Sequence, residues 1–191
     1  MIDREKITAM FEDTGAMLRG HFLLTSGRHS DRYFQCAMVL QHPKYCELLC
    51  SELARKFSDE IVETVIGPAM GGIVMSYEVA RSLNARSLFT ERENGKMTLR
   101  RGFAISPGER VLVVEDVITT GGSVKEVIEY VRASGGIVVG AGVLVNRSGG
   151  SADLGVRTEC LLEIPAVSYT PEECPLCGQG LPFIKPGSRK I

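Results

Sequence analysis

Tryptophan is absent from this chain of 191 residues, and aromatic residues make up only 6% of it. The chain also lacks any apolar run approaching the ~20 residues that a helix needs to cross a bilayer. Its amino terminus, MIDREKITAM, is too polar for the apolar core of a secretory signal. We therefore expect no membrane association and a cytoplasmic protein.

An excess of charge of either sign is missing too. The 22 basic and 23 acidic residues leave a formal net charge of −1, whereas proteins that coat nucleic acid carry a strong basic excess. We therefore expect no nucleic-acid partner. With 44% apolar residues, the chain is long enough for one α/β domain with its own core and too short for two. We expect a single domain over residues 1–191.

The six cysteines fall into two groups. Four lie in apolar or helical surroundings and predict buried thiols in a reducing compartment: Cys36, Cys46, Cys50 and Cys160. Cys174 and Cys177 instead form a CxxC followed by glycine, a knuckle shape that supplies two of the four ligands of a zinc site. His21, His29 and His42 show no metal-binding spacing among themselves. We favour a tight metal-free turn, with structural zinc or a redox dithiol as alternatives.

Helical and strand patterns alternate along the chain, as a parallel sheet requires. Apolar residues recur at helical spacing over residues 7–11 and 46–57. Short apolar runs predict strands near residues 65–66, 87–89, 111–114, 138–145 and 161–164. Helical patterns after the first and third of these runs complete right-handed crossovers. The pattern predicts an α/β fold with a central, mostly parallel sheet flanked by helices.

Residues 111–123, VLVVEDVITTGGS, carry the strongest functional pattern. An unbroken β-branched and leucine run predicts a buried strand, and a turn rich in Thr, Gly and Ser leads into a helix. Backbone N–H groups, hydroxyls and the helix dipole of such a turn suit a phosphate monoester. Glu115 and Asp116 suit a ribose diol or a divalent cation. Ordinary helix capping would explain one hydroxyl but not three with two acids.

Two further segments contain groups that could bind an anionic or polar ligand. Residues 67–72, GPAMGG, form another turn from a strand into a helix, which can bind an anion. Arg147 follows the apolar run 138–145, and its guanidinium could pair bidentately with a carboxylate or a carbonyl. Taken alone, an arginine at such a position is more often a solvated charge at the end of a strand.

Residues 111–123 closely resemble the phosphoribosyl-diphosphate motif of type I phosphoribosyltransferases. Residues 22–34, FLLTSGRHSDRYF, are similar to the orotate-binding segment of the orotate phosphoribosyltransferases, which runs into an aromatic pair, here Tyr33 and Phe34. Residues 67–72 match the family's pyrophosphate loop in position, and Arg147 stands where a family arginine meets the substrate. The simpler alternative for residues 22–34 is an amino-terminal flap whose apolar side chains pack on the core.

This resemblance implies the type I phosphoribosyltransferase fold, with a small hood formed by residues 1–60 and 165–191. It implies transfer of a phosphoribosyl group from 5-phosphoribosyl 1-diphosphate to orotate in de novo pyrimidine (UMP) biosynthesis, with Mg²⁺ held mainly by substrate atoms. Orotate would be bound by Tyr33, Phe34, Thr119 and Arg147. The phosphoribosyl diphosphate would be bound by Gly71, Arg92, Lys96, Glu115, Asp116, Val117, Ile118, Thr119, Thr120, Gly121, Gly122 and Ser123. Of these, Lys96, Glu115 and Asp116 would be catalytic.

The chain departs from the family at two lysines, which are replaced here by Thr25 and Gly71. The segment 91–103, ERENGKMTLRRGF, could compensate through its basic residues: Arg92, Lys96, Arg100 and Arg101. Lys96 is our first candidate for the counterpart of the family's loop lysine, and Arg92 is our second. In the family a mobile loop at this place reaches the partner subunit's site, which implies a homodimer here, with Gly95 as a hinge. A solvated hairpin is the alternative for this segment.

Two other functions use the same phosphosugar motif. A purine or xanthine phosphoribosyltransferase would have a different hood, and residues 22–34 argue against it. A non-catalytic regulator that senses phosphoribosyl diphosphate and binds nucleic acid would need a basic surface or an added domain. The net charge of −1 and the chain length argue against that regulator.

Overall fold

The computed structural model describes residues 2–24 and 27–186. Its main sheet has the strand order β5-β4-β3-β6-β7-β8, and β1 and β2 form a separate antiparallel pair. The strands are β1 (Met17–Leu23), β2 (His29–Phe34), β3 (Thr64–Pro68), β4 (Arg86–Glu93), β5 (Lys96–Thr98), β6 (Arg110–Ile118), β7 (Ile137–Asn146) and β8 (Thr158–Glu163). The helices are α1 (Arg4–Asp13), α2 (Ala37–Leu40), α3 (Pro43–Arg55), α4 (Gly71–Leu83), α5 (Gly122–Ala133) and α6 (Pro175–Gly178).

The predicted parallel sheet is confirmed. Strand β6 lies between β3 and β7 and pairs with both in parallel. Its residues Val111 to Val114 are fully buried, because helices cover both faces of the sheet. All five strands expected from apolar runs are present as β3, β4, β6, β7 and β8.

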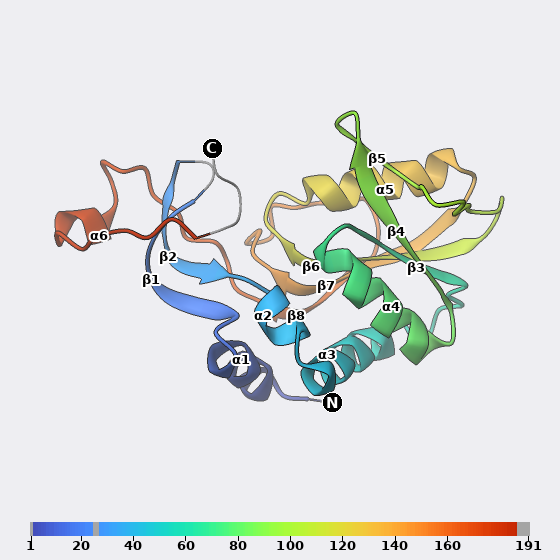
Figure 1. The fold of residues 1–191 in the computed structure, drawn as a ribbon, viewed down its shortest axis with the longest axis horizontal. Coiled ribbons are helices and arrows are strands. Elements are labelled where there is room, and N and C mark those ends of the chain that lie inside the picture. The colour runs from blue at the N-terminus through green and yellow to red at the C-terminus, as the bar shows by residue number, and fades with distance from the viewer. Residues whose placement is uncertain (1, 25–26, 187–191) are drawn as a thin grey trace.

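The helices divide the core into two layers, one on each face of the sheet (Figure 1). Helices α3 and α4 pack on one face, where Leu49 and Leu53 are fully buried. Helix α5 packs on the other face through Val124, Val127 and Val131. The helical spacing of apolar residues therefore corresponds to the buried stripe of each helix.

The hood consists of the β1–β2 hairpin and the carboxy-terminal segment, at the left end of Figure 1. Backbone bridges join Phe22 to Ile184 and His29 to Tyr169, so the two ends of the chain pair directly. We expect the hood to include residues 1–60, but fewer of these residues belong to it in the structure. Helix α3, within that range, packs against α4, β7 and β8 in the core of the main sheet.

The segment 91–103 is more regular than a mobile loop would be. Strands β4 and β5 pair antiparallel, with Arg92 opposite Met97. Between them, Asn94 and Gly95 both have positive φ, 49° and 81°, as in the Asn-Gly turns that close two-residue hairpins. Gly95 therefore lies in the turn of a β-hairpin formed by β4 and β5.

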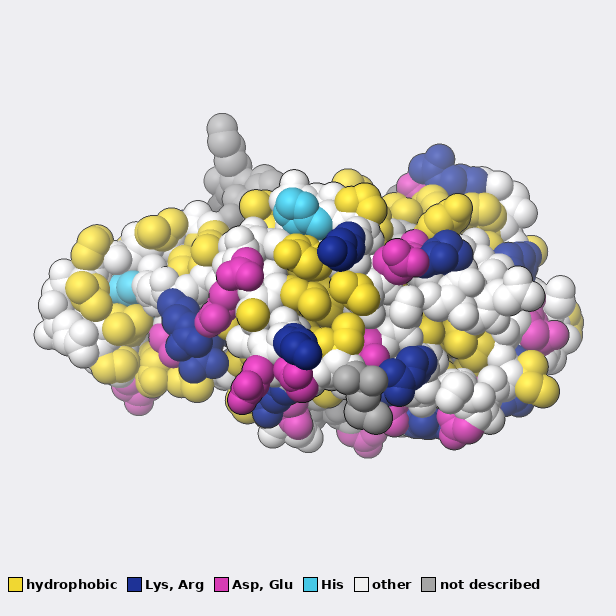
Figure 2. Space-filling model, turned by 90° about the horizontal axis from the view of Figure 1, so that it is seen from below, with side chains coloured by type: hydrophobic (Ala, Val, Ile, Leu, Met, Phe, Trp, Pro, Cys, Tyr) yellow, Lys and Arg dark blue, Asp and Glu magenta, His cyan; other side chains and the backbone are white. Residues whose placement is uncertain are grey.

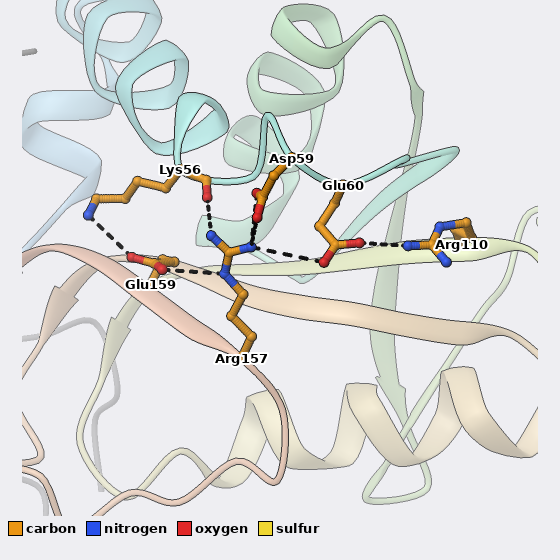
Figure 3. Close-up of polar contacts among 6 residues, drawn as sticks. All are labelled: Lys56, Asp59, Glu60, Arg110, Arg157 and Glu159. Atoms are coloured by element: carbon orange, nitrogen blue, oxygen red, sulfur yellow. Dashed lines mark hydrogen bonds and ion pairs between the residues drawn. The ribbon is translucent and has the colours of Figure 1, made fainter.

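An ion-pair network closes the sheet at the amino-terminal ends of β6 and β8 (Figure 3). The guanidinium of Arg157 donates to both carboxylate oxygens of Asp59, at 2.9 and 2.8 Å, and to the backbone oxygen of Lys56 at 2.6 Å. Glu60 also accepts from Arg110 at 2.6 Å. This network holds the end of α3 against the end of the sheet where β6 and β8 begin.

Among residues 2–24 and 27–186, no helix is long and apolar enough to span a membrane.

Candidate active site

The polar segments predicted from the sequence meet at one edge of the sheet. Strands β3, β6 and β7 are neighbours and parallel, so their carboxyl ends lie side by side. The backbone N–H of Arg147, just after β7, donates to the oxygen of Ile118 at the end of β6, at 2.8 Å. The carboxyl edge of a parallel sheet is where such folds bind ligands.

The turn after β6 surrounds a pocket of about 290 Å³. The pocket is lined by Glu115, Val117, Ile118, Thr119, Thr120, Gly121, Gly122, Ser123, Val124 and Glu126. Gly121 directly precedes α5 with φ of 76°, and a Cβ atom there would lie 2.6 Å from a methyl of Leu154. Glycine is therefore required at this position.

The first turn of α5 is left open for a ligand. Its N-cap is Gly121, and no side chain caps the helix. The first N–H groups of a helix have no partner within the helix, so they can donate to an anion bound at the helix terminus. The capping explanation for the Thr and Ser residues is therefore wrong, and the turn has the form of a phosphate cradle.

Glu115 and Asp116 form a half-buried acidic pair beside this turn. The Asp116 N–H donates to Glu115 at 3.1 Å, and the Val117 N–H donates to Asp116 at 2.8 Å. Burial, followed by the charge of Asp116, raises the pKa of Glu115 to about 9. Burial also raises the pKa of Asp116. Within the part of the chain that the structure describes, neither carboxylate has a cationic partner, so the pair is suited to hydroxyl donors or a cation supplied by a ligand.

The turn after β3 packs against this acidic pair. A Cβ atom at Gly71 would lie 2.7 Å from Oδ2 of Asp116, so a side chain at this position would displace the carboxylate. Gly67 and Gly72 also approach each other too closely for side chains, since a Cβ at Gly67 would lie 2.7 Å from the backbone oxygen of Gly72. Glycine at position 71, where the family resemblance leads us to expect lysine, thus leaves space for Asp116. Thr25, the other departure, lies outside the described residues.

Arg147 is buried behind the site, with only 7% of its surface exposed. Its guanidinium carbon lies 4.9 Å from the centre of the Phe34 ring, and its Nε has no hydrogen-bond partner within residues 2–24 and 27–186. Burial lowers the pKa of Arg147. Of the two interpretations of this arginine, the solvated strand-end charge is wrong. A buried cation with an unsatisfied donor is instead suited to an anionic or carbonyl ligand.

The aromatic pair expected to bind orotate is divided by the fold. Phe34 lies in the core, with its ring edge-on to Phe11 at 6.4 Å between ring centres. Tyr33 is half-buried and lies 5.9 Å from Phe22 in the hood. The ring of Phe34 packs on the core, as the packing alternative for this segment predicts, and its face also contacts the guanidinium of Arg147.

The four basic residues of the segment 91–103 differ in their partners. Arg92 pairs with Glu126 of α5 through two bonds of 3.0 Å, Arg101 pairs with Glu91, and Arg100 lies 3.5 Å from Glu93. Among the described residues, Lys96 is the one of the four that has no acidic partner. It is exposed next to the turn of the hairpin, which favours Lys96 over Arg92 as the cation available to a ligand.

The fold also assembles groups that sequence spacing does not connect. Cys36 is buried as predicted, and it lies near Glu115, Asp116 and Arg147, whose charges influence its raised pKa. In the hood, His21 and His29 lie beside Cys174 and Cys177, although the spacing of the histidines predicts no metal site. These residues come from opposite ends of the chain, so no local pattern could have joined them.

Known proteins resemble this chain over its whole length. Residues 37–161 match the phosphoribosyl transferase domain family. The orotate phosphoribosyltransferase of Pelotomaculum thermopropionicum is 71% identical over 98% of this chain and 99% of its own, and that of Desulforamulus reducens is 68% identical over both full lengths. The crystal structure of orotate phosphoribosyltransferase from Aeropyrum pernix superposes with a TM-score of 0.71 at 30% identity, covering 82% of this chain and 93% of its own. The chain belongs to the phosphoribosyltransferase family and, within it, to the orotate phosphoribosyltransferases.

Proposed function

We propose that the protein transfers the phosphoribosyl group of 5-phosphoribosyl 1-diphosphate to orotate, giving orotidine 5′-monophosphate and pyrophosphate in de novo UMP synthesis. The observation that carries this proposal is the buried guanidinium of Arg147, at the same edge of the sheet as the turn from Thr119 to Ser123 and the half-buried acidic pair. Full-length identities of 71% and 68% to proteins named for this activity support it.

The chemistry needs positioning and charge stabilisation rather than a covalent nucleophile. Pyrophosphate leaves C1 of the ribose as positive charge builds on the ring. The turn from Thr119 to Ser123 would receive the 5′-phosphate through N–H groups and hydroxyls. Glu115 and Asp116 would accept hydrogen bonds from the ribose hydroxyls, and the negative charge of Asp116 would favour the developing cation. Lys96 would neutralise charge on the departing pyrophosphate.

We propose Mg²⁺ as the cofactor. The donor set is suitable, because two half-buried carboxylates without a cationic partner among the described residues provide the oxygen atoms that Mg²⁺ prefers. When bound, the ion would neutralise charge on the leaving pyrophosphate. Glu115 and Asp116 would orient the ribose beside it, and substrate oxygens would provide most of its ligands.

Arg147 would select the base. The carboxylate of orotate can accept two parallel hydrogen bonds from a guanidinium, whereas uracil has no carboxylate to offer. Phe34 keeps the guanidinium in place by stacking on it at 4.9 Å. Thr119 and the backbone of Tyr33 and Phe34 would complete the contacts to the ring.

We further propose a homodimer in which the β4–β5 hairpin serves the partner's site. Exposed apolar side chains gather on α2, α3 and α4: Met38, Leu48, Met70, Val74 and Tyr77. Figure 2 views the helical side of the molecule and shows apolar side chains gathered in the middle of that face, with charged ones around them. Apolar patches of this kind mark protein interfaces. The hairpin of β4 and β5 projects from the sheet in Figure 1, which supports a reach of Lys96, the first residue of β5, beyond its own subunit.

The decisive test is an assay with 5-phosphoribosyl 1-diphosphate and Mg²⁺, run in parallel with orotate, uracil, hypoxanthine and xanthine. We expect turnover of orotate and poor use of uracil, because uracil would leave Arg147 unpaired. Comparable rates with orotate and a purine would end the assignment. Salt-dependent binding to nucleic acid, with no turnover of any base, would point instead to the regulator. Because 5-phosphoribosyl 1-diphosphate is a phosphorylated intermediate of nucleotide synthesis, we propose a cytoplasmic location.

A further inference from the structure

Four metal-binding side chains converge in the hood, away from the acidic pair and the phosphate turn. They are His21 on β1, His29 on β2, and Cys174 and Cys177 around α6. One ligand atom from each lies within 4.8 Å of all the others. Figure 1 shows β1, β2 and α6 together at one end of the molecule, while the strands of the proposed catalytic site lie in the other lobe.

The distances match a tetrahedral zinc site. Zinc–nitrogen bonds of about 2.05 Å and zinc–sulfur bonds of about 2.3 Å place nitrogen and sulfur ligands about 3.6 Å apart at tetrahedral angles. Here Nε2 of His21 lies 3.5 Å from Sγ of Cys174 and 3.7 Å from Sγ of Cys177. Nδ1 of His29 lies 3.2 Å from Sγ of Cys177. The two imidazole nitrogens are closer, at 2.7 Å, so one ring must move outward by roughly half an ångström when a metal binds.

The histidines are oriented as metal ligands are. Nδ1 of His21 lies 2.8 Å from the backbone oxygen of Leu181 and can donate to it, which leaves Nε2 with a free lone pair directed at the cysteines. The backbone of His29 pairs in both directions with Tyr169 at 2.9 Å, which holds β2 against the carboxy-terminal segment. His21, His29 and Cys174 are each at most 5% exposed, so three of the four ligands are shielded from water.

We propose that His21, His29, Cys174 and Cys177 bind one structural zinc ion that fastens the carboxy-terminal segment to the amino-terminal hairpin. Two imidazoles and two thiolates in tetrahedral arrangement are typical of zinc. Four protein ligands leave no open position for water or substrate, so the ion is structural rather than catalytic. It joins residues that are more than 140 positions apart in the chain. Of its amino-terminal ligands, His21 directly precedes the segment 22–34 and His29 lies within it.

The ion stabilises the hood because the unfolded chain has no preformed site, so that metal binding adds to the free energy of folding. Besides the four ligands, the backbone pairs Phe22–Ile184 and His29–Tyr169 join these two segments, together with the ring of Phe183, which lies 5.1 Å from that of His29. Side-chain hydrogen bonds from Arg28 to Ser168 and from Ser30 to the backbone oxygen of Val167 also join them. These contacts lie outside the two core clusters on the main sheet. Loss of the metal is therefore expected to loosen the hood before the main sheet unfolds.

The test uses the full-length protein without an affinity tag. Elemental analysis after equilibration with Zn²⁺ and dialysis is expected to find one zinc ion per chain. Replacement by Co²⁺ should give the visible bands of a tetrahedral ion and a thiolate-to-metal charge-transfer band. The variants Cys177→Ser and His29→Gln should lower zinc affinity by about 10²-fold or more. Loss of a hydrogen-bond partner of a metal ligand already costs about 10- to 100-fold, and loss of the ligand itself should cost more. The matched controls Cys160→Ser and His42→Gln, which change the same residue types elsewhere, should keep it.

Measurements on the wild-type protein keep the proposal testable if a variant does not fold. A folded wild-type protein that retains no zinc, or whose Co²⁺ form shows no thiolate band, overturns the proposal. A disulfide between Cys174 and Cys177 in protein purified under reducing conditions overturns it as well, because both thiolates would then be consumed. The proposal is also overturned if Cys174 and Cys177 remain free thiols and His21 and His29 remain hydrogen-bonded to each other after zinc is added. None of these readouts depends on transferase activity.

Discussion

Gly71 lies so close to Asp116 that a Cβ atom at position 71 would sit 2.7 Å from Oδ2 of the carboxylate. The turn after β3 and the acidic pair after β6 therefore fit together only if residue 71 has no side chain. The contact joins the segment that resembles a pyrophosphate loop to the segment that would hold the ribose. It also explains why the basic side chain expected here from the family resemblance is missing.

The first prediction follows from this contact. Gly71→Ala should turn the Asp116 carboxylate away from the N–H of Val117, and misplacement by about 1 Å can cost ~10²-fold in rate. We expect kcat/KM for 5-phosphoribosyl 1-diphosphate to fall toward that extent while the circular dichroism spectrum stays unchanged. As a control, Gly178→Ala adds a methyl with no atom within 4 Å and should leave kinetics unaltered. Normal kinetics for Gly71→Ala would show that the carboxylate can move without consequence.

The second prediction concerns stability and pH. Glu115 has its pKa raised from 4.5 to about 9, so between these values the folded state keeps a proton that the unfolded state has released. The unfolded state then binds fewer protons, and the free energy of unfolding falls as pH rises through this window. Glu115→Gln removes the titration and should stabilise the protein by about 0.5 to 2 kcal/mol at the alkaline end, with loss of activity.

Urea unfolding of Glu115→Gln and wild type at several pH values measures this effect. Glu129→Gln, which changes an exposed glutamate on α5, is the matched control and should follow the wild-type curve. If the free energy of unfolding falls with the same slope between pH 5 and pH 9 in Glu115→Gln and wild type, Glu115 is not the group responsible for the pH dependence.

The third prediction concerns Arg147. Arg147→Ala removes a buried charged partner, a loss worth roughly 2 to 5 kcal/mol in comparable interactions, and should lower kcat/KM for orotate by ~10²-fold or more. Arg147→Lys should rescue only part of this, because an ammonium neither pairs bidentately nor stacks on Phe34 as a guanidinium does. Arg132→Ala, on the exposed side of α5, serves as control. An orotate KM unchanged in Arg147→Ala would remove this residue from the base site.

The fourth prediction tests whether sites are shared between subunits. Asp116→Asn is nearly isosteric and should fold but lose most activity, and Lys96→Ala should be nearly inactive through loss of the loop cation. After the two variants are mixed under conditions that exchange subunits, half of the dimers are mixed. Each mixed dimer has one site with Asp116 in place and Lys96 donated by the other chain. Activity should therefore return toward about a quarter of wild type, by counting sites in a symmetric dimer.

No recovery after verified exchange would mean that each hairpin serves its own subunit. Mixing either variant with itself is the control and should give no change. A monomeric wild-type protein in sedimentation experiments would reject both the dimer and the shared site.

The fifth prediction concerns the network of Figure 3. Arg157 contacts Asp59, Glu60, Glu159 and the backbone of Lys56, and its guanidinium lies 5.2 Å from the centre of the Phe57 ring. Arg157→Ala should lower the melting temperature clearly, because networks with bidentate geometry contribute more than isolated surface pairs. Arg19→Ala, which removes a single exposed ion pair with Glu12, should have a much smaller effect. Equal effects of the two substitutions would show that the network adds nothing beyond separate pairs.

Much of this protein was predictable from local sequence. Five strands follow from short apolar runs, and the helices follow from apolar residues at helical spacing, because burial on a sheet or helix face imposes those periods. The phosphate turn was predictable for a related reason. Its strand, acids, glycines and hydroxyls are contiguous in residues 111–123, so one segment contains nearly all of its chemistry. The Asn94-Gly95 pair was also a usable signal for the β4–β5 hairpin, which composition alone suggested to be irregular.

The sequence by itself thus determined the elements of the sheet, the phosphate turn and the membership of a family. Only the tertiary structure decided which distant residues meet. It stacked Arg147 on Phe34, paired Arg92 with Glu126 and left Lys96 without an acidic partner among the described residues. It also assembled His21 and His29 with Cys174 and Cys177. Contacts between segments far apart in the chain depend on strand order and on the path of the connections, whereas hydrophobic period and turn composition describe only each segment's own backbone and buried face.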